Sequence, residues 1–99
     1  MSESLDPTGR PRRNPDVIMR QLGDEAVLLD LSTNQYFGLN EVGTEIWNRI
    51  GEGKSLEEII SDLVGIFEVK REECEEDVLA LARELVRNGL ITLGDGPAS

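Results

Sequence analysis

The sequence predicts an α+β domain in which a three-stranded antiparallel β-sheet precedes three α-helices. Two observations lead to this fold class. Residues 17–39 contain three short β-prone runs separated by turn residues. Residues 40–90 contain three segments whose apolar residues recur at helical spacing. The whole chain has 99 residues, which is enough for one such domain and too few for two.

The predicted strands are Val17–Leu22, Glu25–Leu31 and Tyr36–Leu39. Gly23-Asp24 is a turn pair, and Ser32-Thr33-Asn34 supplies short side chains that bond their own backbone. Such tight connections join antiparallel neighbours, so the strands form a meander. The second strand is largely apolar on both faces, and we expect it to be covered on both sides. The third strand has one neighbour in sequence and is expected at the edge of the sheet.

Each of the first two predicted helices begins at a capping residue. Asn40 is placed to cap the first helix. Its apolar stripe consists of Val42, Ile46, Trp47 and Ile50. Ser55 and Glu58 match a capping box, in which each side chain satisfies a free amide of the other residue. The second helix carries Leu56, Ile59, Ile60, Leu63, Val64 and Phe67.

The third predicted helix begins near Arg71 or Glu72, is acidic at its start and basic at its end, and so suits the helix dipole. Gly89 fits the left-handed position after this helix, and Leu90 fits the apolar position that follows. Residues 90–93 then add a short strand or fold back on the core. The order of elements is that of a winged helix-turn-helix architecture with the sheet first.

The composition divides the chain into three parts. Residues 1–15 contain three prolines and little to bury, which predicts a disordered arm, either a simple tail or a segment that touches a partner. Residues 16–93 form the predicted domain, and residues 94–99 a flexible tail. No secretory signal or long apolar run is present, so we expect a cytoplasmic protein without membrane contact.

The charges and the missing residue types argue against several functions. The net charge of −10 is unfavourable for a nucleic-acid partner, because affinity for phosphates comes largely from Lys and Arg. The chain has no histidine, the usual general base, and a single cysteine, Cys74, which acidic neighbours should leave as a buried or idle thiol. The acids from Glu72 to Asp77 are splayed around a helix and are expected to be solvated. We therefore predict no catalysis, no metal and no cofactor.

Three stretches carry a family resemblance, namely VLLDLSTNQYFGLNEVGTEIW, GEGKSLEEIISDL and EEDVLALARELVRNGLI. The matching pieces are the Leu39-Asn40 pair, the segment 53–59, the Asp77-Val78 pair and the closing Gly89-Leu90. In this order and at these spacings, over residues 15–93, they resemble the PqqD family. Its members are precursor-peptide recognition domains of pathways that make ribosomally synthesised, modified peptides.

The resemblance implies a winged-helix fold without catalysis. It also implies a groove between the third strand and the third helix, where the leader of a precursor peptide lies as an added strand. The bound pair is presented to a modifying enzyme, such as one of the radical S-adenosylmethionine type. Members devoted to pyrroloquinoline quinone tend to have an acidic-glycine turn and a smaller residue in place of Trp47. The Ser32-Thr33-Asn34 turn and Trp47 are more similar to relatives in other clusters, including lasso-peptide ones.

The residues themselves also fit peptide binding. An edge strand exposes unpaired amides and carbonyls, and Gly38 allows another backbone to come close. Main-chain hydrogen bonds would then give affinity, and pockets beside the strand would read alternate side chains. The predicted peptide-binding residues are Gln35, Tyr36, Phe37, Gly38, Leu39, Asp77, Val78, Leu81, Arg83, Glu84 and Leu85. In this set Val78, Leu81 and Leu85 form the floor, and Asp77, Arg83 and Glu84 the rim.

Purely structural roles compete for several of these residues. Tyr36 and Phe37 are the types of side chain that more often pack in a core, and Leu81 and Leu85 are typical helix-packing residues. Trp47 is interpreted as a core residue. The alternative function is a winged-helix DNA-binding regulator, against which the acidic third helix argues.

Overall fold

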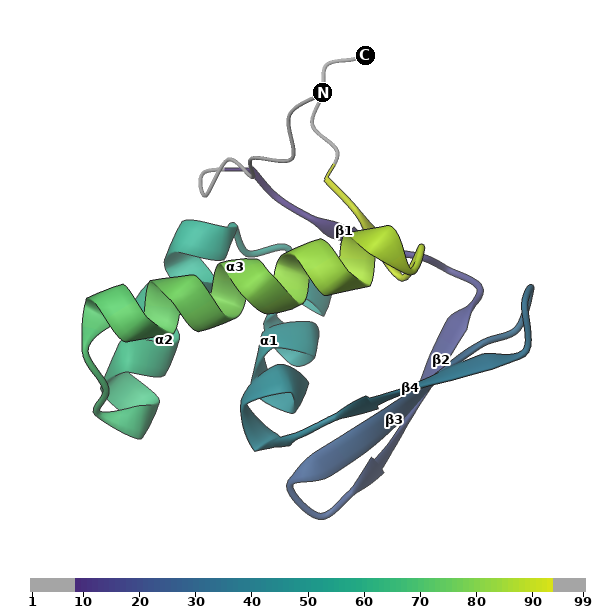
Figure 1. Ribbon diagram of the computed structural model, residues 1–99, viewed down its shortest axis with the longest axis horizontal. Helices are drawn as coiled ribbons and strands as arrows, with labels where there is room; N and C mark the ends of the chain where they lie inside the picture. Colours follow the sequence, from purple (N-terminus) through teal and green to yellow (C-terminus); the bar gives the residue numbers. More distant parts are fainter. Residues whose placement is uncertain (1–8, 94–99) are drawn as a thin grey trace.

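A computed structural model of the chain describes residues 9–93 and has the predicted α+β class (Figure 1). The main sheet is antiparallel, with strand order β2-β3-β4. Its strands are β2 (Val17–Leu22), β3 (Glu25–Asp30) and β4 (Gln35–Leu39). The helices are α1 (Glu41–Gly51), α2 (Leu56–Phe67) and α3 (Arg71–Arg87). The meander, the three helices and the edge position of β4 are therefore confirmed.

The capping residues act as the sequence predicts. Asn40 Oδ1 accepts a hydrogen bond from the Gly43 N–H, which fixes the start of α1 immediately after β4. The capping box of α2 is complete, because the Ser55 hydroxyl accepts from the Glu58 N–H and the Glu58 carboxylate accepts from the Ser55 N–H. After α3, Gly89 has φ +74° and the Leu90 N–H bonds the Leu85 carbonyl, as in a Schellman stop.

The sheet packs against the helices with only one of its faces. Leu28 lies opposite both Met19 and Phe37, and this inner face contacts the core. Side chains on the outer face, such as Leu29, are only half-buried or exposed. The expectation that β3 is covered on both sides is therefore wrong, because all three helices lie on the inner side of the sheet. The core consists of Ala26, Leu28, Leu39, Ile46, Trp47, Ile50, Leu56, Ile59, Ile60, Leu63, Cys74, Val78, Ala82, Leu85, Leu90 and Ile91.

The segment before β2 belongs to the folded domain. Strand β1 (Arg12–Arg13) pairs antiparallel with β5 (Ile91–Thr92), and Pro11 is fully buried. The Arg13 guanidinium lies 5.3 Å from the centre of the Trp47 ring, a cation–π contact over the core. The expected disordered arm is therefore wrong for residues 9–15, which pair with a segment almost 80 positions later. Residues 1–8 and the expected tail, 94–99, lie outside the described residues.

Candidate functional site

An open cavity of about 320 Å³ lies between β4 and the carboxyl end of α3. β4 is an edge strand of the main sheet, so one side of its backbone has no neighbouring strand among residues 9–93. The cavity is lined by Asp30, Thr33, Gln35, Tyr36, Phe37, Arg87, Asn88 and Leu90. The chain thus places an unpaired strand edge beside a hollow that can receive side chains.

The strand residues predicted to bind a peptide fall into two groups. Gln35, Tyr36 and Phe37 line the cavity, with Tyr36 exposed and Phe37 half-buried against the core. Leu39 is buried in the core and does not reach the cavity. Gly38 lies on the outer face, opposite Val27, where it lines a different hollow. β4 therefore lines both the cavity beside α3 and the hollow at Gly38.

The residues of α3 that were predicted to bind a peptide lie on different sides of the helix. Val78 and Leu85 are both 0% exposed and belong to the core, so nothing outside the domain reaches their side chains. Leu81 is half-buried on a flank of the helix. Arg83 lies two residues after Leu81, about 200° around the helix axis, and so points away from that flank.

The flank of α3 that contains Leu81 ends at the cavity. Asp77, Leu81, Glu84 and Asn88 follow one another at spacings of four, three and four residues, which places them along one side of the helix. Asn88 at the end of this row lines the cavity. Asp77 and Glu84 are exposed and Leu81 is half-buried, so the row that ends at Asn88 carries two carboxylates and one apolar side chain.

Sequence reasoning missed five cavity residues, which lie at the end of β3, in a turn, and at or just after the end of α3. Asp30 is the most buried charged group among them, at 4% exposure. Its Oδ1 accepts hydrogen bonds from the Ser32 hydroxyl at 2.7 Å and from the Ser32 N–H at 3.0 Å. These two bonds hold the pKa of Asp30 below its ordinary value, although burial acts in the opposite direction. The others are Thr33, Arg87, Asn88 and Leu90. The only sequence signal for Asn88 and Leu90 was their part in ending α3.

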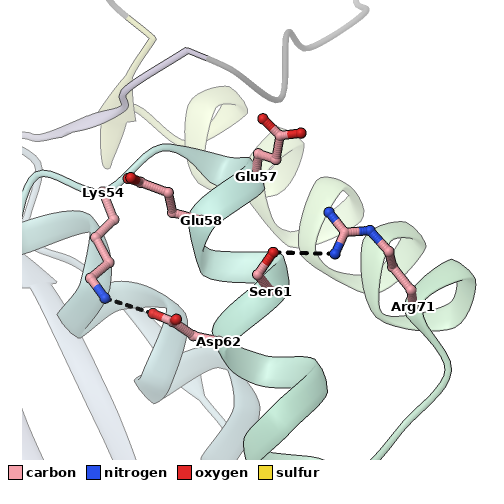
Figure 2. A pocket seen from close by; sticks show the side chains of 6 residues that line it. All are labelled: Lys54, Glu57, Glu58, Ser61, Asp62 and Arg71. Carbon is pink, nitrogen blue, oxygen red and sulfur yellow. Dashed lines mark hydrogen bonds and ion pairs between the residues drawn. The ribbon is translucent and has the colours of Figure 1, made fainter.

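A second hollow of about 450 Å³ lies on α2 and the start of α3, and its charged groups bind one another. Figure 2 shows the Lys54 ammonium pointing at the Asp62 carboxylate, a separation of 2.7 Å, and the Arg71 guanidinium pointing at the Ser61 hydroxyl. Asp62 also accepts a bond from the Arg49 guanidinium at 3.1 Å. The bonds from Lys54 and Arg49 together hold the pKa of Asp62 below its ordinary value. These contacts tie α1, the following loop, α2 and α3 together, so we assign the hollow a structural role.

The described part of the chain shows no assembled reactive centre. Cys74 is buried, its thiol donates to the Ile60 carbonyl, and burial followed by the charge of Asp77 raises its pKa. Residues 9–93 contain no cluster of three or more acidic or cysteine side chains arranged to hold a metal ion. None of the helices in that range is long and apolar enough to cross a membrane.

The fold and the groove together define a winged-helix domain with an open strand edge beside a side-chain cavity. A family model described as "Coenzyme PQQ synthesis protein D (PqqD)" matches residues 25–91, and the chain belongs to this family. The match spans β3, β4 and all three helices, and therefore both walls of the groove.

Two solved structures are similar to the chain over most of its length. The first is "TbiB1 in Complex with the TbiA(beta) Leader Peptide", with 35% identity and a TM-score of 0.77, covering 89% of this chain and 99% of that one. The second is "Lasso peptide synthetase B1 complexed with the leader peptide", with 30% identity and a TM-score of 0.76, covering 84% of this chain and 98% of that one. A comparison with curated protein sequences found no match.

Proposed function

We propose that the chain binds the leader segment of a ribosomally made precursor peptide and presents it to a modifying enzyme. The observation that carries this proposal is the open β4 edge beside the cavity formed with α3. A leader in extended conformation would pair with β4 as a fourth strand, and its main chain would supply most of the affinity. The similarity to two proteins described as leader-peptide complexes supports the binding of a leader peptide.

Side chains of an added strand alternate between the two faces of the sheet. Those on the inner side would enter the cavity, where Phe37 and Leu90 supply apolar surface. Asp77 and Glu84 are exposed on α3, where Glu84 pairs with Arg87 at 3.3 Å. Asp30 lies in the cavity with a lowered pKa and so stays ionised near neutral pH. This arrangement favours a leader that combines an apolar inward side chain with a basic residue near α3.

The proposed role includes no chemistry by the chain itself. Histidine is absent from the sequence, and the single thiol is buried with a raised pKa. The reaction would therefore belong to a partner enzyme, which acts in a lasso-peptide pathway or another modified-peptide pathway. A radical S-adenosylmethionine enzyme is one such partner. The complex would form in the cytoplasm, where ribosomal precursors are made.

Binding to DNA is disfavoured by the charges of α3. In a winged-helix regulator this helix would lie against phosphates, yet it exposes Glu72, Glu73, Glu76, Asp77 and Glu84. This concentration of carboxylates on the helix would repel the phosphates of the duplex.

A calorimetric titration with the TbiA(beta) leader peptide tests the proposal. We expect saturable one-to-one binding in the micromolar range, and no binding of a scrambled peptide of the same composition. Gel retardation with duplex DNA at low salt is the parallel experiment, and we expect no shift. Failure to bind the leader up to millimolar concentration, or a sequence-specific DNA complex at physiological salt, would contradict the proposed function.

A further inference from the structure

Gly38 leaves a gap in the outer face of the sheet. It lies directly opposite Val27 in the register of β3 and β4, and a hollow of about 300 Å³ opens above this pair. Leu22 at the end of β2 forms another wall of the hollow and is 64% exposed. Leu22 and Val27 give the hollow an apolar side, and Glu25 and Asn40 also line it.

Nothing in the folded domain requires glycine at this position. Gly38 is not among the residues with positive φ, so its backbone conformation is open to other amino acids. A Cβ built at Gly38 meets no atom within 4 Å, so a side chain would not clash. Glycine in a strand weakens it, because the residue loses more conformational freedom on folding and has no side chain to pack. The gap therefore costs stability without any gain inside the domain.

We propose that the hollow at Gly38 is a second side-chain subsite for the leader peptide, a deduction that rests on the proposed function. Residues directly opposite each other in an antiparallel pair, or side by side in a parallel one, point to the same face of a sheet. The leader residue beside Gly38 therefore points to the outer face, away from α3. Its side chain lies across the glycine and contacts Val27 on β3.

The occupant is a large apolar side chain, and an aromatic ring fits best. Aromatic residues stabilise edge glycines in sheets by covering the bare backbone from the neighbouring strand. The same ring would bury part of Val27, which is half-buried in the free domain. The leader then has two apolar anchors on opposite faces, one in the cavity beside Phe37 and one above Gly38. Because side chains alternate along a strand, the two anchors are separated by an odd number of positions in the leader.

Filling the hollow from the protein side tests this subsite. We expect Gly38→Val to reduce affinity for the TbiA(beta) leader peptide at least about tenfold, the loss that corresponds to excluding one apolar anchor. Its thermal midpoint should stay equal or rise, because valine favours strands. Gly65→Val is the matched control, since Gly65 is exposed on α2 and its Cβ would also meet nothing within 4 Å. This control should bind the leader as the parent does.

An alanine scan of the same leader peptide identifies the partner residue. One apolar leader position should lose affinity on alanine replacement with the parent protein but show little further loss with Gly38→Val, which is coupling in a double-mutant cycle. The subsite is refuted if the parent binds the leader and Gly38→Val binds within twofold, or if no leader position couples to Gly38. If the parent itself binds no leader, the proposed function fails together with the subsite.

Discussion

Tyr36 provides a sharp test of the groove, because its side chain is 72% exposed in the free domain. A fully covered aromatic side chain buries about 200 Å², so roughly 140 Å² of Tyr36 is available to a ligand. A leader strand beside β4 would cover about half of this area, or roughly 70 Å². At about 25 cal/mol per Å², the covered area contributes about 1.8 kcal/mol to binding. Tyr36→Ala should therefore weaken leader binding about twentyfold.

Calorimetry with the leader peptide measures this loss, and urea unfolding shows whether the variant is folded. We expect the free energy of unfolding of Tyr36→Ala to stay within about 0.5 kcal/mol of the parent, because the side chain packs little. Ile66→Ala is the control, since Ile66 is also exposed, at 49%, but lies on α2 and does not line the groove. Equal leader affinity of Tyr36→Ala and the parent would refute the assignment of Tyr36 to the interface.

Four further predictions follow from the packing and the charges. Ser55→Ala removes a reciprocal cap and should lower the free energy of unfolding in urea by about 1 kcal/mol. The pKa values of Glu58 and Asp62 lie below their ordinary values of 4.5 and 3.8. The bonds that these carboxylates accept therefore stabilise the fold fully above the ordinary pKa values, and this stabilisation is lost as the pH falls through the lowered pKa values. Urea midpoints should drop in acid below about pH 4. Cys74 should react with a thiol reagent at neutral pH only after unfolding. Leu81→Glu should remain folded by circular dichroism, because Leu81 is only half-buried, and should bind the leader at least about tenfold more weakly.

The sequence was sufficient for the elements of the main fold because local signals mark their ends. Asn40 and Ser55 start helices through their own side chains, and Gly89 stops α3 through its positive φ. These contacts join residues close in sequence, so single-residue patterns predict them. The pairing of β1 with β5 joins residues 12–13 to 91–92, and a two-residue strand of arginines has no local pattern that predicts it.

The strand that borders the cavity could be predicted from the sequence, whereas the α3 residues that line the cavity could not. β4 was expected at the edge because it is the last strand of the meander and has one neighbour in sequence. On α3, apolar spacing marks the ridge that packs in the core, and Val78 and Leu85 belong to that ridge rather than to the groove. The cavity residues Arg87 and Asn88 depend on where the end of α3 meets the sheet. That position is set by tertiary packing, which a single sequence does not encode locally.

Hydrogen exchange of the backbone amides, with and without the TbiA(beta) leader peptide, tests strand addition at β4 most directly. An added strand pairs with backbone groups of β4 that are open in the free domain. Strand addition at β4 predicts slower exchange at residues 35–39 and in the second half of α3. It predicts no change at residues 55–63 or in β2, the opposite edge of the same sheet. Slowing that is concentrated in β2 or α2, with β4 unaffected, would contradict the central claim.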